Sequence, residues 1–292
     1  NYDIEYIKAI MSYFGLIIDR LADKNSRLCR VIVQTEAIGF TYGRQALPML
    51  WNYIEMNPLT HPSGWTKTLK EILSSINHLI KLQASPAKVI QCSATNLPYE
   101  NNFFDAVLTD PPYYDNVPYS YLSDFFYVWL KRSIGILYPE LFSTPLTPKT
   151  KEIVAYPNIL SRPKAIIFFE KLFREALKEI YRVLKPNGIA IIIYAYKTRE
   201  GWETVINALL DSRLTITATW PINTEMRARL RAIDSAVLSS SIYIVARKIE
   251  KKETAFYPEV KKQLYLYLNK KLERLWHEGI SGADFFIAAI GA

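Results

Sequence analysis

The stretch Ala165–Tyr194, AIIFFEKLFREALKEIYRVLKPNGIAIIIY, decides the fold class. Residues 165–184 place apolar side chains at helical spacing, and the Lys-Pro-Asn-Gly sequence at 185–188 ends that pattern, because proline and glycine interrupt helices. Every residue of Ile189–Tyr194 is apolar, which is typical of a strand that is covered on both faces in a parallel sheet. The stretch therefore predicts a helix followed by a strand of an α/β domain.

A second apolar run lies upstream, at Phe103–Thr109, and ends in the Asp-Pro-Pro-Tyr sequence of residues 110–113. We predict a strand over 104–109, preceded by a loop over 93–102 and a short strand over 88–92. In an open parallel sheet, ligands bind beyond the carboxyl ends of the strands. The sequence at 110–113 is therefore expected at the edge of the sheet where a ligand binds.

The rest of the chain contains further helical and strand patterns. Apolar spacing predicts a mostly helical first third and additional elements after residue 194. The strands expected at 214–220 and 241–247 are joined without a convincing helix, so we predict that they are antiparallel. The expected helices, besides that at 165–184, are residues 3–23, 43–57, 65–82, 120–131, 202–210 and 259–277.

These patterns divide the chain into three parts. Residues 1–84 are expected to form a helical segment that packs on the central domain. Residues 85–250 are expected to form that domain, with a Pro-rich flap at 139–163, and residues 251–292 a C-terminal helical segment. The chain opens on Asn1 and stops just after an apolar stretch, from which we expect a fragment that is incomplete at both ends.

The charge balance points to an acidic partner. The 292 residues include 36 Lys and Arg against 28 Asp and Glu, a net charge of +8, and nucleic acid is the first candidate. A Lys-rich solubilising surface is an equally good explanation. With 50% hydrophobic residues, the chain is able to bury a large core.

The cysteines and histidines predict neither a disulfide framework nor a metal site. Cys29 and Cys92 are the only cysteines, which favours a reducing, intracellular location, and the three histidines follow no metal-ligand spacing. No apolar run reaches the roughly 18 residues of a membrane span, and the N-terminus lacks the layout of a signal peptide. We therefore expect a soluble, cytoplasmic protein without a metal ion.

The turn at 110–113 combines a carboxylate, two carbonyls and an aromatic ring. Consecutive prolines remove two backbone donors, so the carbonyls of Asp110 and Pro111 are available to accept hydrogen bonds from a ligand. The exocyclic amino group of a base offers two N–H donors, and a carboxylate can orient it and stabilise positive charge on its nitrogen. Tyr113 can stack on a base extruded from a duplex. The turn predicts amino-group methylation of a base, and a strand-ending proline turn with a buried tyrosine is the alternative.

On these residues the chain resembles a known family. The sequence at 110–113 matches the motif of amino-group S-adenosylmethionine methyltransferases, and residues 109–132 look like the large adenine-specific DNA methylases that often carry a zinc ribbon. Three further stretches agree with that family: residues 43–51, 220–226 and 279–291. The resemblance implies a Rossmann-like methyltransferase fold, with a mostly parallel sheet and an antiparallel closing strand, and S-adenosylmethionine as the methyl donor.

The resemblance also implies roles for individual residues. An Asp in the first position of the motif favours adenine N6 in DNA as the target. The residues expected at the target amine are Asp110, Pro111, Pro112 and Tyr113. The residues expected at the cofactor are Cys92, Ser93, Ala94 and Asp110. Ser93 stands where many relatives have Asp.

The glycine pattern departs from that family. Its members hold the methionine part of the cofactor on a glycine-rich turn of the type Phe-x-Gly-x-Gly. The chain has 10 glycines, none of them spaced Gly-x-Gly. In the family this turn lies upstream of the region that the chain resembles, so we expect an upstream segment or a second chain to supply it.

Other residues extend the expected substrate site. Lys197 and Arg229 are candidates for a phosphate track, with a solvated charge run as the alternative, and Tyr114 is a candidate for a pocket wall beside Tyr113. The prediction as a whole is a methyltransferase that acts on the N6 amino group of a flipped adenine in DNA. Two alternatives remain open: an RNA amino-group methyltransferase, and a non-catalytic nucleic-acid-binding subunit that lacks the cofactor turn.

Overall fold

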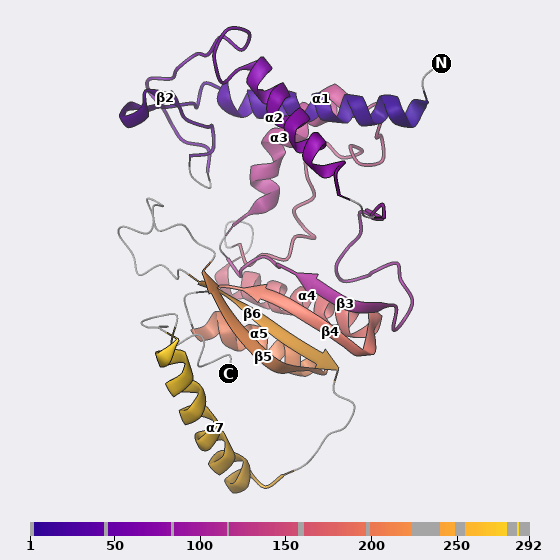
Figure 1. The fold of residues 1–292 in the computed structure, drawn as a ribbon, viewed down its shortest axis with the longest axis vertical. Coiled ribbons are helices and arrows are strands. Elements are labelled where there is room, and N and C mark those ends of the chain that lie inside the picture. Colours follow the sequence, from indigo (N-terminus) through magenta and orange to yellow (C-terminus); the bar gives the residue numbers. More distant parts are fainter. Residues whose placement is uncertain are drawn as a thin grey trace. The chain divides into compact units, whose positions relative to one another are not determined.

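A computed structural model describes residues 3–43, 46–82, 85–115, 117–156, 161–196, 199–223, 240–248, 255–278 and 285. The chain divides into two compact units (Figure 1). The first comprises Asn1–Val89 and Val117–Glu152, and the second Ile90–Asn116 and Ile153–Ala292. Residues 117–152, which the sequence pattern places in the central domain, therefore belong with the N-terminal helices. Helices and a mixed sheet together confirm the α/β class.

Three helices form the framework of the first unit, at positions close to those predicted. They are α1 (Ile4–Lys24), α2 (Trp65–Leu79) and α3 (Tyr119–Ile134). A short antiparallel pair, β1 (Val31–Ile32) and β2 (Ala37–Ile38), is joined by the 3-10 turn η1 (Val33–Thr35). α3 approaches α1 closely at Gly15, where an added Cβ would lie 3.2 Å from Ile134 and 3.3 Å from Leu130. A larger residue at this position would push the two helices apart.

Asp19 lies one helical turn after Gly15 on α1, and its carboxyl group is buried. Its side chain is 7% exposed, and its Oδ1 has no hydrogen-bond partner among the described residues. Burial raises the pKa of this carboxyl from 3.8 to about 7. Between these two pH values the folded protein holds a proton that the unfolded chain releases, so stability falls as pH rises.

We predict that Asp19→Asn removes this pH dependence. The variant is expected to match the wild type near pH 4 and to exceed it at pH 8 by about 2–4 kcal/mol, because at pH 8 the wild type holds a buried ionised carboxylate where the variant holds a neutral amide. Denaturant unfolding at pH 4, 6 and 8 measures the difference, with the exposed Glu55→Gln as the control. Parallel pH profiles for wild type and Asp19→Asn would contradict the assignment.

The second unit is built on a four-stranded sheet in the order β3-β4-β6-β5. The strands are β3 (Phe104–Thr109), β4 (Leu184–Tyr194), β5 (Leu214–Asn223) and β6 (Ser240–Lys248). β3 and β4 are parallel, with Thr109 opposite Ile192, whereas β6 is antiparallel to both β4 and β5. β3, β4 and β5 therefore run in one direction, and β6 runs against them between β4 and β5.

This topology corrects part of the prediction for the sheet. The antiparallel relation between the strands expected at 214–220 and 241–247 is confirmed. The sheet is not mostly parallel in its pairing, because β3 with β4 is the one parallel pair among the described strands. The reason is that the reversed strand β6 lies between β4 and β5, so that it separates two strands of the same direction.

Two helices, α4 (Arg162–Val183) and α5 (Arg199–Asp211), lie together on one face of the sheet (Figure 1). The side chains directed to this face are almost fully buried: Ala190, Ile192, Tyr194, Ile242, Ile244 and Ala246. Side chains at the alternate positions, such as Ile191 and Ile193, are half-buried. Helix α7 (Tyr257–His277) joins the core through Leu275, which is 3% exposed.

Two predicted elements are wrong. Residues 88–92 form no strand, and Val89 is 90% exposed. A strand needs a neighbouring strand to accept and donate its backbone hydrogen bonds, and this segment pairs with none of the described strands. Residues 46–57 form no helix. Pro48 would stand inside that helix, where it removes a hydrogen bond and clashes with the preceding turn. Instead, the Ile54 N–H donates to the Cys29 carbonyl at 3.3 Å.

The predicted stop at 185–188 is part of β4. Phe104 pairs with Leu184 and Ala106 pairs with Ile189, so residues 185–188 bulge out of the ladder instead of separating helix from strand. Gly188 permits this bulge, since an added Cβ would lie 2.7 Å from the Leu184 side chain and 3.0 Å from the Asp105 carbonyl. Among the helices of the described ranges, none is long and apolar enough to cross a membrane.

Candidate functional site at the end of β3

The sequence at 110–113 begins directly after β3, at the carboxyl edge shared by β3, β4 and β5. Pro111, Pro112 and Tyr113 are half-buried, while the side chain of Asp110 is exposed. Within the described part of the chain, the Asp110 carboxylate has no hydrogen bond or ion pair. The turn therefore combines a fixed backbone with a carboxylate that is accessible to a ligand.

The backbone of this turn uses the carbonyl of Pro112 for its own hydrogen bond. The Tyr114 N–H donates to that carbonyl at 3.1 Å, and the Tyr114 carbonyl accepts from the Ala155 N–H at 2.9 Å. Tyr114 has a φ of 54°, a left-handed conformation that turns the chain sharply. No turn or loop hydrogen bond between described residues uses the carbonyls of Asp110 and Pro111.

An aromatic frame from distant parts of the second unit holds the turn. The ring of Tyr113 packs edge-on against Tyr194 at the end of β4, with centroids 5.6 Å apart. The buried ring of Tyr114 contacts Phe169 of α4 at 5.1 Å and Tyr196 at 5.2 Å. These contacts join the end of β3 to α4 and to the segment that follows β4.

A short hydrogen bond reinforces this frame. The Tyr196 hydroxyl donates to Oδ1 of Asp115 at 2.6 Å. Burial raises the pKa of Tyr196, and its hydrogen bond to Asp115 raises it further, so the hydroxyl stays protonated and remains a donor at physiological pH. This bond fixes the end of the turn to the residue that lies two positions beyond β4.

Trp202 packs against both Tyr194 and Tyr196. Its indole N–H donates to the Tyr196 carbonyl at 3.0 Å, and its ring packs edge-on against Tyr194 with centroids 5.3 Å apart. The neighbouring Gly201, in the first turn of α5, leaves room for the Tyr196 ring, because an added Cβ would overlap that ring. The aromatic frame of Tyr113, Tyr114, Tyr194, Tyr196 and Trp202 therefore rests on α5.

Three of the predicted cofactor residues, Cys92, Ser93 and Ala94, lie in a turn that precedes β3, and the fourth, Asp110, follows β3 directly. Cys92 is exposed, and Ser93 bonds within its own turn, through its hydroxyl to Thr95 Oγ1 at 2.9 Å and through its carbonyl to the Asn96 N–H at 3.1 Å. Among the described residues, no hydrogen bond joins Cys92, Ser93 or Ala94 to the 110–113 turn. The described residues therefore show no direct hydrogen bond between these two parts of the predicted site.

The connection between that turn and β3 is fixed to the end of α4. Arg182 donates to the carbonyls of Leu97 and Tyr99 at 2.9 and 2.7 Å, and it pairs with Glu179 at 2.8 Å. Hydrogen bonding from Arg182 lowers the pKa of Glu179, which also accepts from the Leu97 N–H at 2.9 Å. The chain thus enters β3 along a fixed course that sets the position of Asp110 at its far end.

The other predicted substrate residues have different outcomes. Tyr114 is a buried part of the aromatic frame, whereas Lys197 and Arg229 lie outside the described residues. Sequence reasoning missed the anchoring role of Tyr196 and the support from Trp202. The signal available was the Tyr-x-Tyr spacing at the end of β4, followed by Gly-Trp at the start of the next helix.

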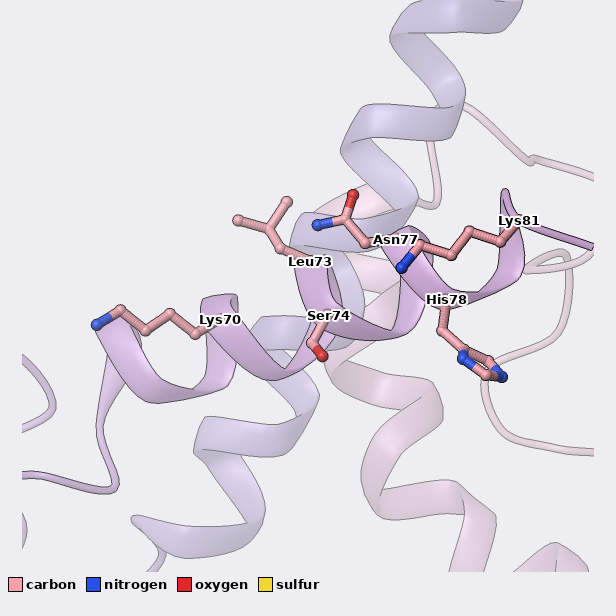
Figure 2. Close-up of a pocket in the computed structure, with 6 residues that line it drawn as sticks. All are labelled: Lys70, Leu73, Ser74, Asn77, His78 and Lys81. Carbon is pink, nitrogen blue, oxygen red and sulfur yellow. The ribbon is translucent and has the colours of Figure 1, made fainter.

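Two shallow depressions lie elsewhere on the molecule. One, of about 460 Å³, is at the opposite end of β3 and is lined by Asn102, Asp105, Lys185, Pro186, Asn187 and Gly188. The other, of about 400 Å³, lies on the exposed side of α2 in the first unit, as Figure 2 shows. Neither includes a residue of the 110–113 turn. No group of His, Cys, Asp and Glu in the described ranges could hold a metal ion.

Comparison with known proteins adds no assignment. The chain matches no protein-family model, and no curated protein matches it significantly. Evidence for the function of the chain therefore comes from the chemistry of the turn and its surroundings.

Proposed function

We propose that the protein is an S-adenosylmethionine-dependent methyltransferase that acts on the exocyclic N6 amino group of adenine in DNA. The observation that carries this proposal is the exposed Asp110 carboxylate, which stands at the carboxyl edge of the sheet on a turn fixed by two prolines and by the aromatic frame. A carboxylate without a partner in the described residues has lone pairs available for donors such as an amino group.

The proposed step requires the chain to hold an amino group and to balance the charge that forms on it. The Asp110 carboxylate accepts one N–H of the amine and the Pro111 carbonyl accepts the other, which directs the nitrogen lone pair away from the turn. The negative charge of Asp110 offsets the positive charge that develops on nitrogen as a methyl group arrives. Tyr113 stacks on the adenine ring after the base leaves the duplex.

The sheet supports this proposal. Three strands of one direction and a reversed strand are compatible with the Rossmann-like methyltransferase fold that the sequence resemblance implies. In such a sheet, the carboxyl edge is where nucleotide-like ligands bind. The turn at 110–113 stands at this edge, so the proposed reaction takes place where the fold favours a ligand.

S-adenosylmethionine, when bound, supplies an electrophilic methyl group on a sulfonium. The residues present fit only the amine side of the reaction. The chain has no Gly-x-Gly turn for the methionine part of the cofactor, and the hydroxyl of Ser93 is engaged with Thr95. An upstream segment or a second chain that supplies the glycine turn remains part of the proposal.

Two alternative functions fit the same observation. A nucleic-acid-binding subunit that does not bind the cofactor would keep the aromatic frame and would need no glycine turn. An RNA amino-group methyltransferase would use the same turn on a different substrate, and it would prefer structured RNA to duplex DNA.

Calorimetric titration of S-adenosylmethionine and a methylation assay test the proposal together. The titration is made with the chain and with the chain extended upstream. We expect the extended protein to bind the cofactor and to form N6-methyladenine in duplex DNA, detected by mass spectrometry. An oligonucleotide without adenine on either strand is the control substrate. Binding by neither protein would favour the non-catalytic subunit, and methylation of RNA alone would favour the RNA enzyme.

A further inference from the structure

Helix α2 has two faces of different chemistry. On one side the ring of Trp65 stacks on Phe14 of α1, with centroids 6.2 Å apart and ring planes at 11°. Leu69, Ile72 and Ile76 recur on the same side and are half-buried. These contacts fix the orientation of the helix, so the opposite side is directed to solvent.

The solvent side carries a straight stripe of polar side chains. Lys70, Ser74, Asn77 and Lys81 follow one another at intervals of four, three and four residues, which places them in line along the helix, and all are exposed. Hydrogen bonds from Ile80 to Ile76 and from Lys81 to His78 continue the helical turn as far as Lys81. Figure 2 shows these side chains around the shallow depression on α2.

The charge along this stripe has one sign. Glu71 is the sole acidic residue of the sequence from 65 to 82, and it lies at the border of the stripe, 3.9 Å from the Lys67 ammonium. The stripe itself offers two ammonium groups together with the hydroxyl of Ser74 and the amide of Asn77. This composition suits an anionic surface that is recognised by charge and by hydrogen bonds.

We propose that the α2 stripe of Lys70, Ser74, Asn77 and Lys81 binds the phosphate backbone of duplex DNA. Lys81 lies eleven positions after Lys70, about 16 Å along the helix axis, and duplex DNA carries one charge per roughly 1.7 Å of its axis, so both lysines meet phosphates at once. The inference rests on the proposed function in that it takes DNA as the substrate. It adds a binding surface that is separate from the 110–113 turn.

The double variant Lys70→Gln/Lys81→Gln tests the stripe. We expect its Kd for a labelled duplex to rise roughly tenfold near 0.1 M salt, measured by fluorescence anisotropy without cofactor. The slope of log Kd against log salt is expected to fall by about 2, one unit for each phosphate that is no longer neutralised. Because both side chains are exposed, the circular dichroism spectrum and the unfolding midpoint are expected to stay unchanged.

The matched control is Lys171→Gln/Lys178→Gln on α4. These lysines are also exposed and also lie on one side of a helix, but Glu175 stands between them, so that stripe has mixed charge. The control removes the same total charge from the protein. An equal change in affinity and slope for both double variants would show a general charge effect and would overturn the assignment to α2.

The outcomes for DNA binding and for methyl transfer are distinguishable. Unchanged DNA binding by Lys70→Gln/Lys81→Gln would overturn the inference, and methyl transfer by the wild type would still support the enzyme. Loss of DNA binding by this variant, in a protein that binds no cofactor even when it is extended upstream, would support the inference and overturn the enzyme. Absence of DNA binding by the wild type would overturn the inference and would leave an acidic protein as the partner to test.

Discussion

Asp110→Ala is expected to lower kcat for methyl transfer to adenine by a factor of about 10² to 10³ and to leave the fold unchanged. The proposed reaction loses the group that accepts an amine N–H and offsets the positive charge on nitrogen. Folding loses little, because the side chain is exposed and has no partner within the described residues. Single-turnover rates with duplex DNA measure the effect on the chemical step.

Asp105→Ala is the matched control for this prediction. It makes the same substitution on the same strand, at the end remote from the turn, and removes an exposed ion pair of 2.7 Å with Lys185. Exposed pairs of this kind contribute little to stability, so neither activity nor folding is expected to change much. Asp110→Asn keeps an acceptor oxygen but loses the charge, so its kcat is expected to lie between that of the wild type and that of Asp110→Ala. Full activity in Asp110→Ala would remove Asp110 from the proposed mechanism.

Local patterns are enough to predict most helices and strands of the molecule. The stretch at 165–194 contains α4 and most of β4, since apolar spacing and an apolar run depend on neighbours in sequence. Such patterns fail where formation of an element depends on distant partners. Residues 88–92 have strand composition but no described strand beside them, and Pro48 outweighs the helical spacing of its neighbours.

The sequence also could not predict which face of the sheet the helices cover. The apolar sequence Ile189–Tyr194 predicts burial on both faces, whereas α4 and α5 lie on one face. Residues directed to the opposite face are half-buried, and Leu108 of β3 is 71% exposed. An apolar run shows that a strand is central in a core, but it does not show which elements cover each face.

Only the part of the candidate site that is local in sequence could be predicted. The sequence at 110–113 identifies a rigid turn with a carboxylate, and the structure places it at the carboxyl edge of the sheet. The support of that turn is nonlocal, because the hydrogen bond from Tyr196 to Asp115 joins residues 81 positions apart. Such a pair has no periodicity in the sequence that would reveal it.

Trp202→Ala is expected to destabilise the second unit by about 3–5 kcal/mol. The indole is 1% exposed, lies between α5 and the end of β4, and loses both its ring packing on Tyr194 and its hydrogen bond to the Tyr196 carbonyl. The cavity left by the missing indole removes support from the aromatic frame. The rate of methyl transfer is therefore expected to fall as well, even at a low temperature where the variant stays folded. Denaturant unfolding followed by circular dichroism measures the loss of stability.

Two further variants separate packing from hydrogen bonding at this position. Trp202→Phe keeps most of the ring and loses the N–H. It is expected to lower stability by about 1–3 kcal/mol, the cost of leaving the Tyr196 carbonyl without its hydrogen bond. Trp220→Ala, on β5 and 56% exposed, removes the same side chain from a surface position and is expected to cost below about 1 kcal/mol. Equal losses in Trp202→Ala and Trp220→Ala would contradict the role of Trp202 as the support of the site, because only a buried ring can transmit its loss to Tyr194 and Tyr196.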